Sequence, residues 1–165
     1  MHEKSIELLN KAVADELAAV HQYMYFHFHC DDQAYDMLAG LFKRTAVEEM
    51  MHVEILAERI LFLGGEIKME VADPVEYIHD VTKMLEKARA MEEESALDYN
   101  KMANESATNA DSVTKKIFEE LVADEERHFD QYDTELDNIA KHGKEYLALQ
   151  SIERSKNISA GKSTD

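Results

Sequence analysis

Apolar residues recur at steps of three and four along most of the 165-residue chain, a spacing that places them on one face of an α-helix. Gly64 and Gly65 end the second such stretch with a strong helix-stop signal. The pattern therefore predicts four long helices and a short fifth one, all within a single domain of residues 1–155. The predicted helices cover residues 4–30, 34–63, 76–106, 111–141 and 144–154.

The scarcity of helix breakers supports an all-α fold, because the chain holds one proline and five glycines. Residues 66–75 contain that proline and form a connection that is too long for a tight turn. We therefore expect two antiparallel helix pairs joined by one long crossover, which is a four-helix bundle with a short C-terminal fifth helix. Residues 156–165 are polar, and we expect them to form a disordered tail.

Acidic and imidazole side chains interrupt the apolar stripes of the four long helices, and they recur at one fixed offset in residue number. That offset is the distance along the chain from Glu16 to Glu92, and it relates three further pairs: Tyr23 and Tyr99, Glu49 and Glu125, and His52 and His128. The first half of the chain thus looks like an ancestral copy of the second half. We expect these polar residues to form one site with pseudo-twofold symmetry.

Two Glu-x-x-His motifs carry the chemistry of this site. Glu49 and His52 are three residues apart, as are Glu125 and His128, so each pair lies about 60° apart on its helix and shares one face. Two such helices, with one glutamate from each of the other two, form the ligand set of dinuclear carboxylate bundles. A third motif, from Glu76 to His79, has no acid at the same offset further on, and we interpret it as a surface feature.

Charge balance points to a pair of divalent cations at this site. Four buried glutamates carry four negative charges, which two divalent cations would cancel, whereas an unpaired buried carboxylate costs several kcal/mol or becomes protonated. Mixed carboxylate and imidazole ligands suit iron or manganese, with zinc possible. Symmetry makes Glu49 and Glu125 the expected bridges and Glu16 and Glu92 the terminal ligands. Tyr23 is expected beside these ligands, as a core aromatic bonded to a carboxylate or as a redox tyrosine.

The formal net charge of −17 disfavours nucleic acid and anionic membranes as partners and favours cations. A single cysteine, Cys30, excludes an internal disulfide framework and suits a reducing cytoplasm. The N-terminal stretch MHEKSIELLNKAVADELAAV is amphipathic and contains acids, so it does not resemble a signal peptide. No run of 18 apolar residues occurs, and we expect a cytoplasmic protein without a membrane partner.

The chain resembles bacterioferritin, the heme-containing branch of the ferritins, over residues 5–154. The matching stretches are NKAVADELAAVHQY, EEMMHVEILAERILFLGG, ADEERHFDQYDTELDNIAKHG and EYLALQSIER. The resemblance implies a homo-oligomeric hollow cage, usually of 24 subunits, that stores ferric mineral. It also implies a di-iron ferroxidase centre within each subunit, which oxidises Fe(II) with dioxygen or hydrogen peroxide. The implied iron ligands are Glu16, Glu49, His52, Glu92, Glu125 and His128.

Met50 and Met51 lie between the two ligands of one motif but point out of the bundle, at about 100° and 200° from Glu49. The resemblance makes Met50 an axial ligand of heme, one heme being shared by two subunits across a twofold interface. It also implies a ferredoxin-type reductant for iron release. Some members of the family carry a histidine and an aspartate on the inner cavity face, where this chain has Arg44 and Glu48, so an accessory iron site there is in doubt.

Three other functions fit parts of the pattern. A rubrerythrin-like di-iron peroxidase usually carries a four-cysteine domain, which this chain lacks. A DNA-protecting mini-ferritin builds its site between subunits, whereas here all six expected ligands belong to one chain. A bundle that only buffers metal would bind iron without consuming dioxygen.

Overall fold

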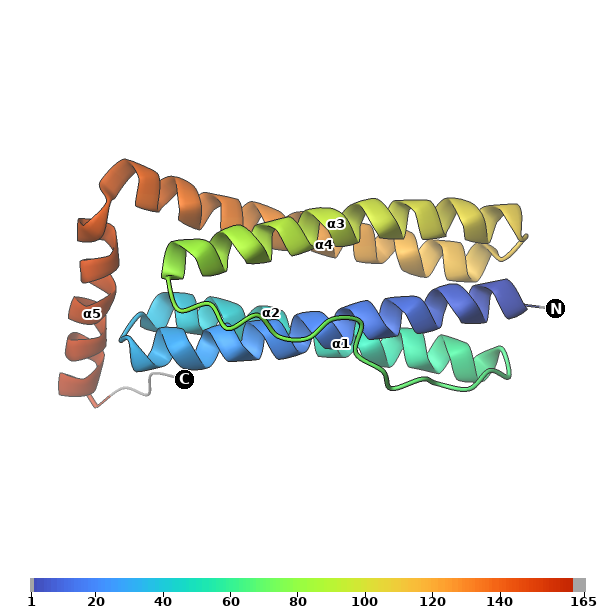
Figure 1. The fold of residues 1–165 in the computed structure, drawn as a ribbon, viewed down its shortest axis with the longest axis horizontal. Helices are drawn as coiled ribbons and strands as arrows, with labels where there is room; N and C mark the ends of the chain where they lie inside the picture. The colour runs from blue at the N-terminus through green and yellow to red at the C-terminus, as the bar shows by residue number, and fades with distance from the viewer. Residues whose placement is uncertain (1, 162–165) are drawn as a thin grey trace.

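The computed structural model describes residues 2–161, and every regular element among them is an α-helix (Figure 1). The prediction of an all-α bundle with a fifth helix is therefore confirmed. The five helices are α1 (Glu3–Asp32), α2 (Asp36–Phe62), α3 (Val81–Thr108), α4 (Ser112–His142) and α5 (Lys144–Ser159). None of the described helices is long and apolar enough to cross a membrane.

Helix α1 packs mainly against α2, and α3 packs mainly against α4, so the bundle consists of two antiparallel pairs (Figure 1). The crossover from α2 to α3 runs along α1 from one end of the bundle to the other. Two buried amides on α1 hold it there. The side chain of Asn10 bonds the backbone of Glu66 and Lys68 at 3.0 and 2.8 Å, and that of Gln22 bonds both backbone groups of Glu76 at 2.8 and 3.0 Å.

The predicted start of the third helix at residue 76 is wrong, because α3 begins at Val81. Its N-cap is Asp80, whose carboxylate accepts a hydrogen bond from the backbone N–H of Lys83 at 2.9 Å. The bonds from Gln22 hold Glu76 in the crossover instead. The sequence pattern alone does not reveal these long-range bonds.

Helix α5 lies across one end of the bundle (Figure 1). Gln150 accepts a hydrogen bond from the backbone N–H of Leu38 at 3.2 Å, and Arg154 donates to the Asp36 carboxylate at 2.9 Å. The helix continues to Ser159, so the prediction of a disordered tail from residue 156 is wrong for residues 156–159. Residues 162–165 of that predicted tail lie outside the described part of the chain.

The bundle interior contains two apolar clusters with a polar layer between them. One cluster contains Phe26, Phe42 and Tyr132, and the other contains Leu9 and Phe118. Along each long helix the predicted acid lies between residues of the two clusters, as Glu16 lies between Val13 and Ala19 on α1. The fold therefore encloses the polar residues in the middle of the bundle, where apolar packing surrounds them on both sides.

Candidate metal centre

The structure brings the six predicted ligands together from all four long helices. Each of them is at most 4% exposed. Buried acids and histidines are costly unless they are hydrogen-bonded, paired with an opposite charge or bound to a metal ion. They form two overlapping groups, in each of which one ligand atom per residue lies within 4.8 Å of all the others. The two groups are Glu16, Glu49, His52 and Glu125, and Glu49, Glu92, Glu125 and His128.

Both histidines turn the same ring nitrogen toward the carboxylates. The Nδ1 atom of His52 lies 2.9 Å from Glu49 Oε2 and 3.3 Å from Glu125 Oε1. The Nδ1 atom of His128 lies 3.1 Å from Glu49 Oε1 and 3.5 Å from Glu92 Oε2. The two imidazole rings are 6.1 Å apart, so each group has a nitrogen ligand of its own.

Several buried atoms of the centre lack a hydrogen-bond partner among the described residues. Such orphaned atoms are costly and uncommon in a folded interior. A bound cation would satisfy them, since they are lone-pair atoms that face a shared space. They are both carboxylate oxygens of Glu49, one oxygen each of Glu92 and Glu125, and the Nδ1 atoms of His52 and His128.

The charges of the centre shift the pKa values of its members in opposite directions. Burial acts to raise the pKa of Glu49, but the two nearby histidines outweigh it and lower the value to about 2. Burial acts to lower the pKa of His128, but Glu49 and Glu92 outweigh it and raise the value to about 11. Burial and the charge on Glu49 raise the pKa values of Glu16 and Glu125 well above the usual carboxyl range. The centre therefore holds protons that a cation would displace.

Two further carboxylates, which the sequence analysis missed, contact the outer nitrogens of the histidines. The Nε2 atom of His128 lies 2.7 Å from Glu48 Oε2, and that of His52 lies 3.1 Å from Asp124 Oδ2. An ionised carboxylate can only accept, so each Nε2 carries the proton and each Nδ1 is left as the possible metal ligand. The sequence does contain a signal for them, because Glu48 and Asp124 are related by the same offset as the ligands.

Two tyrosines bond the terminal carboxylates in a crossed arrangement. The Tyr99 hydroxyl donates to Glu16 Oε1 at 2.6 Å, and the Tyr23 hydroxyl donates to Glu92 Oε1. Each tyrosine thus contacts the glutamate of the other half of the repeat. Both tyrosine side chains are buried, and each bond fixes one oxygen of its carboxylate. In Glu92 the other oxygen, Oε2, lies 3.5 Å from His128 Nδ1, whereas in Glu16 the bonded Oε1 itself lies 3.3 Å from His52 Nδ1.

Other residues that the sequence singled out lie outside this centre. Glu76 is exposed and pairs with Lys87 at 2.7 Å, and His79 stacks on His29 with ring centres 4.5 Å apart. Met50 is 55% exposed, as expected from its outward direction on α2. Met51 is 54% exposed.

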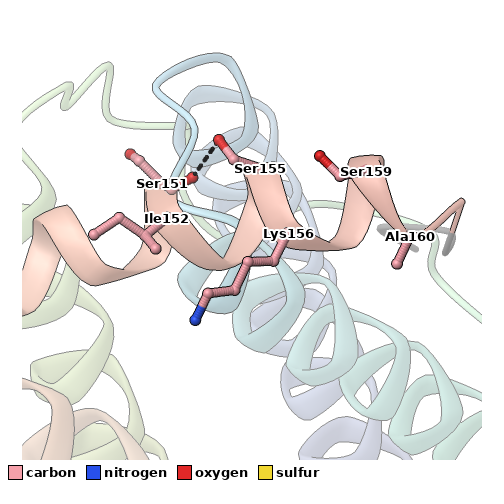
Figure 2. Close-up of a pocket in the computed structure, with 6 residues that line it drawn as sticks. All are labelled: Ser151, Ile152, Ser155, Lys156, Ser159 and Ala160. Atoms are coloured by element: carbon pink, nitrogen blue, oxygen red, sulfur yellow. Dashed lines mark hydrogen bonds between the residues drawn. The ribbon is translucent and has the colours of Figure 1, made fainter.

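A hollow on the surface of the molecule is also separate from the centre. It has a volume of about 670 Å³ and lies along α5, outside the four long helices (Figure 2). The Ser155 hydroxyl donates to the backbone carbonyl of Ser151 at 3.1 Å. Figure 2 shows this bond, with the Lys156 side chain on the opposite side of the helix. The hollow is lined by Ser151, Ile152, Ser155, Lys156, Ser159 and Ala160, a set without acid or histidine ligands.

Comparisons with known proteins agree with this geometry. Residues 6–142 match the ferritin-like domain family. The chain is 37% identical to a bacterioferritin of Desulfovibrio desulfuricans over 88% of its own length and 81% of that protein's. It is 35% identical to a bacterioferritin of Brucella melitensis, over 86% and 88% of the two lengths.

A crystal structure of the D. desulfuricans bacterioferritin and its diiron site, reduced in solution and allowed to reoxidise before crystallisation, superposes with a TM-score of 0.88. It is 36% identical in sequence, and the match covers 90% of this chain and 86% of that one. The predicted resemblance is thus confirmed, and the chain belongs to the bacterioferritin family of ferritin-like proteins.

Proposed function

We propose that the protein is a ferroxidase that oxidises Fe(II) to Fe(III) and stores the product. The observation that carries this proposal is the pair of overlapping ligand groups that share Glu49 and Glu125. Two cations in neighbouring groups would be bridged by the shared carboxylates, at the spacing of about 3.5–4 Å that two-metal sites use. The diiron site of the similar D. desulfuricans protein supports iron as the metal.

The geometry supports a distinct role for each ligand. Glu49 and Glu125 bridge the two ions, since each belongs to both groups. One ion takes its further ligands from Glu16 and His52, and the other takes them from Glu92 and His128. Tyr23 and Tyr99 orient the terminal carboxylates through the hydrogen bonds described above.

Iron is the substrate of this reaction, and the bundle supplies a place where two ions react together. Each Fe(II) gives up one electron, and the oxidant takes both. Dioxygen with two protons would leave as hydrogen peroxide, whereas hydrogen peroxide with two protons would leave as two water molecules. The displaced protons of the histidines and carboxylates are available nearby, and the apolar clusters on either side exclude bulk water.

Storage of the product extends the proposal to an assembly. We propose a homo-oligomeric cage of 24 subunits that encloses ferric mineral, with release driven by a ferredoxin-type reductant. The net charge of −17 supports this role, because an acidic protein attracts Fe(II) from solution. The cytoplasmic location stays a prediction.

Heme is the resident cofactor that the family implies, and the residues around Met50 fit it. A thioether can ligate heme iron, and apolar neighbours can cover the flat faces of the ring. Four outward side chains of α2 together provide the thioether ligand and the apolar cover. Heme would supply electron transfer at the subunit interface. The exposed apolar side chains are Val47, Met50, Met51 and Ile55, and each is 44–55% exposed.

The heme proposal predicts the loss of a spectrum when its ligand is removed. Protein purified with heme should show a Soret band that Met50→Leu abolishes, because leucine keeps the volume of methionine but lacks the sulfur. Met51→Leu should retain the band, because Met51 is not the proposed ligand. It is a matched control, since it has nearly the same exposure on the same helix. A Met50→Leu protein with an unchanged Soret band would exclude Met50 as the ligand. Absorption spectra at equal protein concentration are sufficient.

The ferroxidase proposal is tested by dioxygen uptake when Fe(II) is added to chelator-treated protein. We expect uptake well above that of Fe(II) in buffer alone, and a particle of cage size on a sizing column. Binding of Fe(II) without uptake would identify a metal-buffering bundle. A small oligomer that retards DNA on a gel would favour the mini-ferritin alternative.

A further inference from the structure

One arginine joins the two carboxylates that contact the histidines. The Nη2 atom of Arg127 donates to Glu48 Oε2 at 2.6 Å and to Asp124 Oδ1 at 3.0 Å. Glu48 accepts from His128, and Asp124 accepts from His52. A single guanidinium group is therefore connected to both histidines, each time through one carboxylate.

We propose that Arg127 is a positioning residue that holds both histidines in their ligand orientation through Glu48 and Asp124. This inference rests on the proposed di-iron function, because it assigns Nδ1 of each histidine to the metal. The bonded Nε2 atoms fix the tautomer and the ring direction, which is the usual task of outer partners at metal sites.

The exposure of these groups shows why a clamp is needed. The His52 and His128 side chains are buried, whereas the side chains of Glu48 and Asp124 are 38% and 42% exposed. A half-exposed carboxylate can rotate into water and leave its histidine without a partner. The two carboxylates also carry like charges, and the guanidinium between them removes the repulsion. Arg127 thus fixes two side chains that burial alone would not fix.

A contribution to overall stability is the weaker explanation. Arg127 is 44% exposed, and ion pairs of such exposure contribute about 0–1 kcal/mol. Its equivalent in the first half of the repeat is Met51, so the arginine is absent from that half. One arginine therefore serves both halves, as expected of a clamp between two symmetric partners.

Both bonds come from the two N–H donors of a single nitrogen, Nη2, which the planar guanidinium holds in fixed directions. Lysine carries one compact charge and cannot hold two carboxylates in fixed directions as a planar guanidinium does. Arg127→Lys should therefore restore part of what Arg127→Gln loses. Arg89→Gln is the matched control, since Arg89 is 39% exposed and forms an ion pair at 2.6 Å with Asp133, which is not one of the candidate ligands or their partners.

The test is an anaerobic titration of chelator-treated protein with Co(II), followed by its visible absorption bands, which report ligand geometry. We expect Arg127→Gln to weaken Co(II) binding about 10- to 100-fold and to change the bands. Arg127→Lys should fall between that variant and the wild type. The melting temperatures of the metal-free Arg127→Gln and Arg89→Gln proteins should agree.

Wild-type Co(II) affinity and bands in Arg127→Gln would overturn the inference, as would an equal loss in Arg89→Gln. The titration also separates this inference from the proposed function. A wild-type protein that binds Co(II) but does not oxidise Fe(II) would defeat the ferroxidase proposal, while a weakened Arg127→Gln variant would still support the clamp. A wild-type protein that binds no Co(II) would contradict both.

Discussion

Replacing Glu125 with glutamine should nearly abolish Fe(II) oxidation and yet leave the metal-free bundle at least as stable as the wild type. Burial and the charges on Glu49 and Glu92 raise the pKa of Glu125, so its neutral form is favoured when no cation is bound. A neutral amide of the same shape keeps the packing and can donate to Glu92. The amide cannot replace the bridging carboxylate, however, so the oxidation rate should fall by more than the roughly 100-fold that is lost when an outer partner of a metal ligand is removed.

This first prediction is checked by two measurements on the same samples. Initial rates of Fe(II) oxidation give the loss of activity, and thermal unfolding of chelator-treated protein gives the stability. We expect a melting temperature that is unchanged or raised by a few degrees. In a chain of this size, each kcal/mol of added free energy of unfolding raises the melting temperature by about 2–4 °C. Glu126→Gln is the control, because Glu126 is the exposed next residue of α4. Retained activity in Glu125→Gln would contradict the bridging role.

Replacing Glu49 with glutamine should also stop Fe(II) oxidation but destabilise the metal-free bundle. Its pKa is lowered to about 2 because both histidines lie close to its oxygens, at 2.9 and 3.1 Å. Loss of the carboxylate would leave His52 and His128 without their central partner. Breaking a buried ion pair in this way lowers the free energy of unfolding by about 3–5 kcal/mol, which corresponds to a fall of about 10 °C in melting temperature.

The pH dependence of this second prediction follows from the sign of the pKa shift. A carboxyl group with a lowered pKa stabilises the folded state above its unfolded pKa, and that contribution is lost as the pH falls through the folded value. The stability difference between wild type and Glu49→Gln should therefore be complete at pH 7 and shrink below about pH 4, toward pH 2. Equal metal-free stability of Glu49→Gln and Glu125→Gln would contradict the assigned charge states.

The polar repeat made much of the centre predictable from the sequence. One shared offset in residue number identified the six candidate ligands that the structure brings together, along with the two tyrosines. Glu48 and Asp124 obey the same offset, but half-exposed acids in a chain with 35 acidic residues resemble ordinary surface charges. Arg127 breaks the repeat, so its link to both halves becomes visible only in three dimensions.

The errors at the helix ends have a similar physical cause. The start of α3 depends on the amide of Gln22, which bonds Glu76 from a distant position on α1. The extension of α5 beyond residue 154 is polar and includes an exposed local ion pair between Lys156 and Glu153 at 3.1 Å. A pattern of apolar residues contains neither contact, because it reports which face of a helix is buried and not which polar groups begin or extend the helix.

The central claim is that the four glutamates and two histidines bind two iron ions that react together. Its most direct test is the rapid phase of Fe(III) formation when oxygenated buffer is mixed with metal-free protein preloaded anaerobically with increasing Fe(II). The two ligand groups predict an amplitude that rises until two Fe(II) per subunit are bound and then stays constant. An amplitude that saturates at one Fe(II) per subunit, or no rapid phase at all, would contradict the claim.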